Sequence, residues 1–178
     1  MKLEGIDIDN VMEMAKDTVK QYGDHIPTFI LCRANGEMMI VGAQYDERDK
    51  AAFKSQLKSM IDSNDVVRYA QIVTAWMANT DNIKEAIREV VEQVNSAEDI
   101  RQMLEEVREF MKPPSENPLK KEILAVLWYE KCGNQDQRII EISRTESNKP
   151  VFGESVDIGG QGRLFNYWNV WEDEGTEE

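Results

Sequence analysis

The sequence has very little of the two residue types that most often carry catalysis and metal binding: one histidine and two cysteines in 178 residues. A structural zinc site takes about four ligands, chiefly cysteine and histidine, so three such residues do not provide one. Cys–His catalysis would need His25 beside Cys32 or Cys132. Cys32 lies in an apolar segment, which favours a buried, unreactive thiol. Asp24 precedes His25, but adjacency in sequence does not orient a base, and we interpret His25 as structural. The scarcity of histidine and cysteine favours a protein that is not an enzyme.

Long apolar runs are also missing. No stretch approaches the roughly 18 consecutive apolar residues of a membrane helix. The segment from Met1 to Gly5 lacks the apolar core of a signal peptide. We therefore expect a cytoplasmic protein, whose two cysteines stay free and largely buried in a reducing environment.

Basic residues are outnumbered, with 21 Lys and Arg against 34 Asp and Glu and a formal net charge of −13. Contact with a phosphate backbone requires clustered Lys and Arg, so direct nucleic-acid binding is not expected. An acidic surface attracts basic proteins and can imitate nucleic acid in front of them. The alternative is that the charge only keeps the protein soluble.

Local signals divide the first 78 residues into helices and strands. Apolar residues recur at helical spacing up to Tyr22, with Asp7 or Asp9 as the cap and Gly23 as the end. Asn35-Gly36, between two apolar segments, is typical of a tight β-hairpin. The pattern predicts helices over 8–22 and 46–62 and strands over 28–32, 38–42 and 66–78.

The middle of the chain predicts a helical insertion at 81–112. Ser96 stands three residues before Asp99, which resembles a capping box and favours two helices over one long helix. A single unbroken helix is the alternative, because the apolar residues before and after Ser96 keep nearly the same helical phase. The proline-rich segment 113–118 ends the helical region. Further strands are predicted at 123–131, 138–144 and 151–158.

Hairpins outnumber βαβ crossovers in this order of elements, which predicts an α+β fold. We expect one domain over 1–164, with a mainly antiparallel sheet, helices packed on it and an inserted helical hairpin at 81–112. Residues 165–178 would form a tail that is first aromatic and then acidic.

Two groups of residues are candidate binding sites. Tryptophan and tyrosine are frequent anchors of protein interfaces. The first group is the C-terminal partner-binding segment: Phe165, Tyr167, Trp168, Trp171, Glu172, Asp173 and Glu174. The second group would line a small-molecule pocket: Trp76, Trp128 and Tyr129. Each group could equally pack into the protein's own core.

No cofactor or metal ion is expected. The acidic group at 46–49 is better explained as the start of a helix, where negative charge favours the helix dipole. The segment Gly159-Gly160-Gln161-Gly162 does not fit the phosphate-loop pattern and is interpreted as a hinge.

Three segments carry a resemblance. They are Ala75-Trp76-Met77, the run from Pro114 to Leu124, and Arg144 with the turn from Lys149 to Gly153. Together they resemble uncharacterised proteins of bacterial and phage genomes over about the middle half of the chain. The resemblance implies a microbial or viral source and brings no function.

The first functional hypothesis is an acidic, non-enzymatic interaction protein of the inhibitor, immunity or nucleic-acid-mimic type, binding a basic protein partner. The alternatives are a small-ligand-binding protein or carboxylate-dependent enzyme, and a structural or assembly protein that buries a sheet edge.

Overall fold

The computed structural model describes residues 6–43, 47–78, 80–94, 96–155 and 169–171. The chain forms two compact units. The first, called here the sheet unit, comprises Met1–Thr74 and Leu124–Glu178. The second, the hairpin unit, comprises Ala75–Ile123 and contains the predicted helical insertion.

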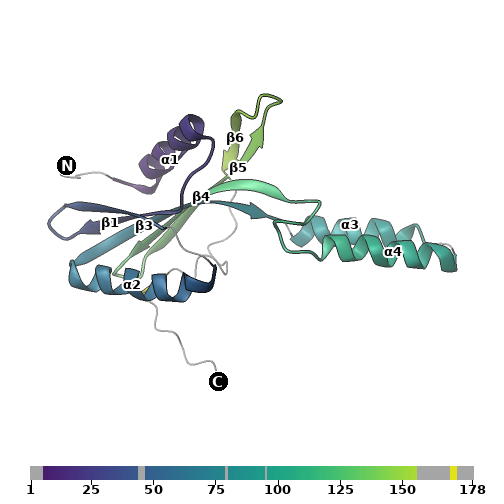
Figure 1. The fold of residues 1–178 in the computed structure, drawn as a ribbon, viewed down its shortest axis with the longest axis horizontal. Coiled ribbons are helices and arrows are strands. Elements are labelled where there is room, and N and C mark those ends of the chain that lie inside the picture. Colours follow the sequence, from purple (N-terminus) through teal and green to yellow (C-terminus); the bar gives the residue numbers. More distant parts are fainter. Residues whose placement is uncertain (1–5, 44–46, 79, 95, 156–168, 172–178) are drawn as a thin grey trace, which may run out of the picture. The chain divides into compact units, whose positions relative to one another are not determined.

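The elements follow the predicted α+β order (Figure 1). They are α1 (Ile8–Tyr22), β1 (Thr28–Arg33), β2 (Met38–Gly42), a 3-10 turn (Glu47–Asp49), α2 (Lys50–Ser63), β3 (Val66–Met77), α3 (Thr80–Glu92), α4 (Ala97–Phe110), β4 (Lys121–Glu130), β5 (Gln135–Arg144) and β6 (Pro150–Ser155). The strands form one sheet in the order β2-β1-β3-β4-β5-β6. β1 pairs antiparallel with β2 and β3, and β5 pairs antiparallel with β6. The mainly antiparallel α+β fold with an inserted helical hairpin is thereby confirmed.

The ends of the elements follow local chemistry. Asp7 caps α1, because its carboxylate accepts a hydrogen bond from the backbone N–H of Asn10 at 2.8 Å. Gly23 ends α1 with a left-handed φ of 84°, as the sequence predicts. Gly36 has a φ of 82° in the turn between β1 and β2, a conformation that glycine adopts at little cost.

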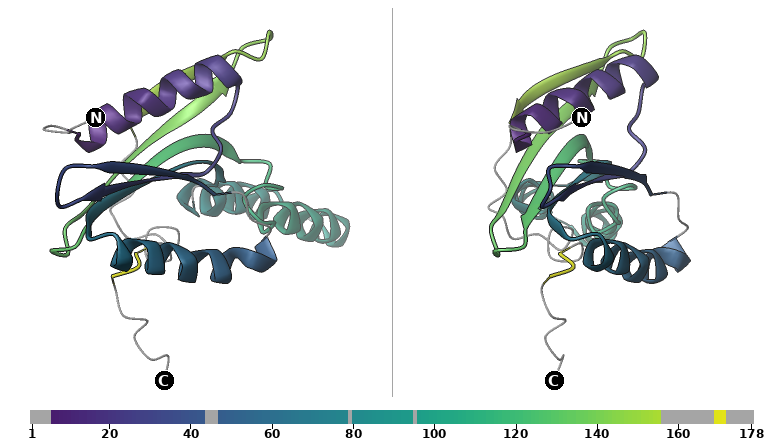
Figure 2. Two further views of the ribbon diagram at one scale, coloured as in Figure 1. Left: turned by 60° about the vertical axis from the view of Figure 1, so that its left-hand side comes forward. Right: turned by 90° about the vertical axis from the view of Figure 1, so that its left-hand side faces the viewer.

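Helices cover both faces of the sheet, and Figure 2 shows α1 and α2 on opposite sides of it. α1 packs its apolar stripe on alternate residues of the central strands. This first core contains Ile8, Val11, Met12, Ala15, Val19, Ile30, Ala70, Ile72, Leu124, Val126, Trp128, Ile140 and Ile142. The amphipathic period of α1 therefore matches one apolar face of the sheet.

The second core lies on the α2 face. It contains Phe29, Leu31, Ala43, Leu57, Ile61, Val66, Tyr69, Leu127, Tyr129 and Val170. Tyr69 is fully buried, and its ring stacks on Tyr129 at a centroid distance of 4.6 Å. The hydroxyl of Tyr69 accepts a hydrogen bond from the backbone N–H of Val170 at 3.0 Å. The second core thus recruits a segment about a hundred positions away in sequence.

Several details differ from the sequence-based expectation; for example, β4 begins at Lys121 and β5 at Gln135, two and three residues earlier than expected. The helix expected over 46–62 begins as the 3-10 turn and becomes α-helical only at Lys50. Cys132 was expected to be largely buried, but it is exposed because it lies in the turn after β4. Cys32 is partly buried and packs against the first core.

Candidate functional site

The hairpin unit carries an acidic pair of helices. α3 and α4 lie side by side (Figure 1), and the break between them falls at the predicted cap. The hydroxyl of Ser96 accepts a hydrogen bond from the backbone N–H of Asp99 at 3.3 Å. The sequences of α3 and α4 contain nine acidic and four basic residues, a net charge of −5. This surface therefore attracts positive charge.

The two helices also leave apolar side chains exposed. Where the structure describes burial, no side chain of α3 or α4 is fully buried. Val91, Ile100 and Leu104 are 49%, 46% and 52% exposed. An amphipathic stripe spans more than 100° of the helix surface, so one neighbouring helix covers only part of it. The hairpin unit therefore presents acidic and apolar groups together.

A hollow of about 140 Å³ lies where α3 ends and α4 begins. We call it the hairpin notch; its lining residues are Val90, Gln93, Val94, Asp99, Gln102, Met103 and Glu106. Two of these residues are acidic and none is basic. Gln102 donates a hydrogen bond from Nε2 to the carboxylate of Glu106 at 2.9 Å, which holds that side chain. The notch therefore combines apolar side chains with two carboxylates.

The connector after α4 is fixed by a buried amide. Asn117 is 1% exposed, and its Nδ2 donates to the backbone carbonyl of Phe110 at 2.7 Å. Its Oδ1 accepts from the backbone N–H of Leu119 at 2.8 Å. The ammonium of Lys120 lies 4.7 Å from the ring centroid of Trp76, a cation–π contact. Hence the segment that returns from α4 to the sheet is held by its own side chains.

Of the predicted C-terminal partner-binding residues, only Trp171 is described. Its ring is half-buried, 5.0 Å from the ring centroid of Tyr69. The backbone carbonyl of Val170 accepts a hydrogen bond from the Lys58 ammonium at 3.2 Å. Trp171 therefore contributes to the sheet unit's own packing. The other six members lie outside the described residues: Phe165, Tyr167, Trp168, Glu172, Asp173 and Glu174.

Two of the predicted pocket residues, Trp128 and Tyr129, lie on opposite faces of the sheet. Trp128 packs in the first core and Tyr129 in the second, because consecutive residues of β4 point to opposite faces of the sheet. Trp76 is 45% exposed and belongs to the hairpin unit. Because neighbouring side chains on a strand point to opposite faces, the sequence alone could have placed Trp128 and Tyr129 on different faces of the sheet.

His25 is buried, but its surroundings do not form a catalytic dyad. The carboxylate of Asp24 accepts from the backbone N–H of His25 at 2.7 Å and from the hydroxyl of Thr74 at 2.6 Å. It therefore anchors the loop and does not orient the imidazole.

Burial raises the pKa of the Cys32 thiol, against a smaller opposing effect of the Arg68 charge. A thiol with a raised pKa is a weak nucleophile at neutral pH.

The described ranges contain neither a metal-binding cluster nor a helix that could span a membrane. There, no three His, Cys, Asp or Glu residues gather closely enough to hold an ion. Among the helices in that same part of the chain, none has the length and apolar character needed to cross a bilayer.

Comparisons with known proteins give no further assignment, since no family model, no curated protein and no solved structure matches this chain. The function must therefore be argued from the site.

Proposed function

We propose that this is a non-enzymatic interaction protein whose hairpin unit binds a basic partner protein. The hairpin notch carries the proposal, because apolar residues (Val90, Val94 and Met103) and two carboxylate residues (Asp99 and Glu106) line the same hollow. A lysine or arginine of the partner would lay its methylene stem against these apolar side chains and place its charge at the two carboxylates.

The charge around the notch supports a basic partner. The net charge of −5 on α3 and α4 is part of the overall −13, so the local field and the field of the whole chain both draw in positive charge. Such fields accelerate association and are screened as ionic strength rises. We expect fast, salt-sensitive binding, as in inhibitors, immunity proteins and nucleic-acid mimics.

The exposed apolar residues support a protein partner over a small cation. Val91, Ile100 and Leu104 offer area for side-chain packing in addition to charge. Protein interfaces combine an apolar centre with a polar rim. The two free cysteines fit a reducing cytoplasm, where the proposal places the protein.

The test uses paired charge-removing variants of the full chain. Asp99→Asn with Glu106→Gln removes the two carboxylates of the notch and keeps the side-chain shapes. Glu146→Gln with Glu154→Gln removes two exposed carboxylates of the sheet unit and is the matched control. Both variants would be used to capture partners from lysate of the source organism at low and high salt, followed by affinity measurement with the purified partner.

We expect the notch variant to lose about tenfold or more in affinity, since each lost interfacial charge contact costs about 1 kcal/mol or more. The control should bind within about twofold of the wild type. Equal binding by the two variants, or a partner that is not basic, would contradict the proposal.

The C-terminal segment is tested separately. Truncation before Asn169 would also remove Val170 and Trp171, which pack in the second core. A loss of binding could then result from a loss of stability. Glu172→Gln, Asp173→Asn and Glu174→Gln together remove the charge and leave that packing in place. If this triple variant loses binding and the notch variant does not, the partner site is the C-terminal segment.

A further inference from the structure

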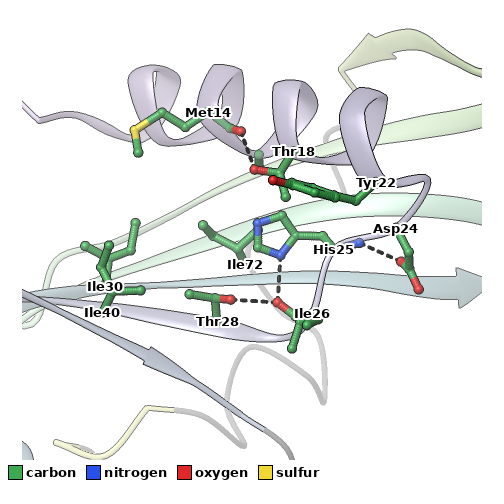
Figure 3. A pocket seen from close by; sticks show the side chains of 11 residues that line it. Met14, Thr18, Tyr22, Asp24, His25, Ile26, Thr28, Ile30, Ile40 and Ile72 are labelled. Carbon is green, nitrogen blue, oxygen red and sulfur yellow. Dashed lines mark hydrogen bonds between the residues drawn. The ribbon is translucent and has the colours of Figure 1, made fainter.

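A second cavity, larger than the hairpin notch, lies in the sheet unit. Its volume is about 430 Å³, within the range of small-molecule sites, which runs from about 300 to 1,000 Å³. Figure 3 shows it beneath α1, on the face of β1, β2 and β3. The buried side chains of Ala15, Ile30 and Ile72 form its floor, which is therefore apolar.

The rim of this cavity gathers large apolar side chains that the fold leaves in solvent. Met14, Tyr22, Ile26 and Ile40 are 47%, 72%, 58% and 66% exposed, and all four line the cavity. Scattered apolar residues on a surface need no explanation, but a contiguous group around a hollow marks a binding site. The cavity thus offers an apolar floor and an apolar mouth.

One buried polar group points into this apolar space. His25 is 7% exposed, and its Nδ1 lies 2.7 Å from the backbone carbonyl oxygen of Ile26. A carbonyl oxygen only accepts, so Nδ1 carries the proton. In the neutral ring the other nitrogen, Nε2, is then an acceptor. Among the described residues no hydrogen bond reaches Nε2, which in Figure 3 lies on the side of the ring toward Met14, Ile30 and Ile40.

The protonation state of His25 follows from its burial. Desolvation lowers the pKa of His25 from its ordinary value, while the bond to Ile26 and the charge of Asp24 act in the opposite direction. The imidazole is therefore neutral at physiological pH, and Nε2 keeps its lone pair.

Two of the three hydroxyl groups that line the cavity already donate their protons, and the third belongs to Tyr22, which is 72% exposed. Thr18 donates to the backbone carbonyl of Met14 at 3.0 Å, and Thr28 donates to that of Ile26 at 2.6 Å. Asp24 contributes a carboxylate, which only accepts. Thr18, Thr28 and Asp24 thus offer a ligand acceptors and negative charge, which disfavours anions, and the phenol of Tyr22 adds one exposed hydroxyl at the rim.

We infer that this cavity binds a neutral, mainly apolar small molecule that carries one hydrogen-bond donor, the class of phenols, alcohols and indole-type N–H compounds. The donor bonds Nε2 of His25, and the apolar body lies between α1 and the sheet on Ile30 and Ile72. This site is independent of the hairpin notch and does not rest on the proposed partner.

The first experiment compares two probes of nearly equal shape with the wild-type protein. 2-Naphthol carries one hydroxyl donor, whereas 2-methoxynaphthalene carries none. Titration of each probe is followed by its own fluorescence and by the side-chain nitrogen resonances of His25, which are unambiguous because the chain has one histidine. We expect 2-naphthol to bind about tenfold more tightly, the worth of one hydrogen bond to a buried acceptor, and to shift the Nε2 resonance.

Two variants separate the hydrogen bond from the apolar cavity. His25→Phe keeps a ring and removes the acceptor, so the preference for 2-naphthol should fall to about one. Ile40→Gln changes an exposed rim residue and leaves the fold intact, so it should weaken both probes equally. Val151→Gln, at a comparably exposed apolar residue of β6, is the matched control and should change neither affinity.

Three results would overturn the inference. They are equal affinity of the wild type for the two probes, no binding of either probe, and binding that Ile40→Gln and Val151→Gln affect alike. The affinities of the wild type, Ile40→Gln and Val151→Gln test the inference even if His25→Phe does not fold.

Discussion

The two units of this protein bury their apolar residues to very different degrees. The sheet unit encloses two cores, one under each helix. In the hairpin unit, by contrast, only Asn117 and Ile123 are buried among the residues whose burial is described. A fully buried aliphatic side chain contributes about 1.5–3 kcal/mol, so the stability of the chain is concentrated in the sheet unit. The hairpin unit keeps its apolar surface available for other contacts.

The largest test of this difference is a pair of leucine truncations. Leu31→Ala removes a fully buried side chain of the second core and should lower the free energy of unfolding by about 2–5 kcal/mol. Leu104→Ala truncates a half-exposed residue of α4 and should change it by less than about 0.5 kcal/mol. Urea unfolding of both variants measures the two values. Equal losses would show that the hairpin unit shares the core's stability.

The hydroxyl of Tyr69 provides a more focused test. Tyr69→Phe leaves the buried N–H of Val170 without its acceptor and should cost about 1–3 kcal/mol. Tyr22→Phe makes the same chemical change at a ring that is 72% exposed and should be neutral. Thermal unfolding compares the two. A neutral Tyr69→Phe would mean that residues 169–171 do not depend on this bond.

The helix caps sharpen the comparison further. Asp7→Ala and Ser96→Ala each remove a side chain that accepts from the first turn, worth about 1 kcal/mol at either helix. Because α1 is part of a core, Asp7→Ala should lower global stability. Ser96→Ala should instead raise amide hydrogen exchange in α4 and leave the midpoint of sheet unfolding nearly unchanged. A global loss in both would contradict independent units.

The smallest expected effect is the pH dependence that His25 contributes. Its folded-state pKa is lowered by burial, so the unfolded chain binds the proton more readily. Stability from this group is therefore complete above the ordinary histidine pKa of about 6.5 and is lost as pH falls from there toward the lowered value. NMR titration of the single imidazole should give a pKa below 6.5. His25→Gln should reduce the slope of stability against pH below the ordinary histidine pKa of about 6.5. A measured pKa of His25 at or above the ordinary value would contradict the desolvation of its imidazole in the folded protein.

Much of the fold was predictable because its signals are short-range. The caps at Asp7 and Ser96 and the turn at Gly36 each depend on residues within about four positions, so their chemistry can be read in the sequence. The period of apolar residues likewise predicted which segments are helices and which are strands. The 3-10 start before α2 was missed, because no distinct local signal marks it.

The candidate sites were less predictable because their residues meet only through packing. Val90 and Glu106 face one hollow since α4 turns back along α3, and composition does not give that register. His25, Ile40 and Ile72 line one cavity only because α1 packs on the sheet. An isolated histidine in a loop carries no sign of this environment.

The sequence by itself determined the α+β class, the acidic charge, the scarcity of catalytic groups and the caps that separate α3 from α4. These follow from composition and from interactions between near neighbours. Only the tertiary structure decided that Trp128 and Tyr129 serve opposite cores, that Tyr69 holds Val170, and that His25 turns a free nitrogen toward an apolar cavity. The physical reason is that burial and hydrogen bonding between distant segments depend on how whole faces pack, and no local pattern encodes that arrangement.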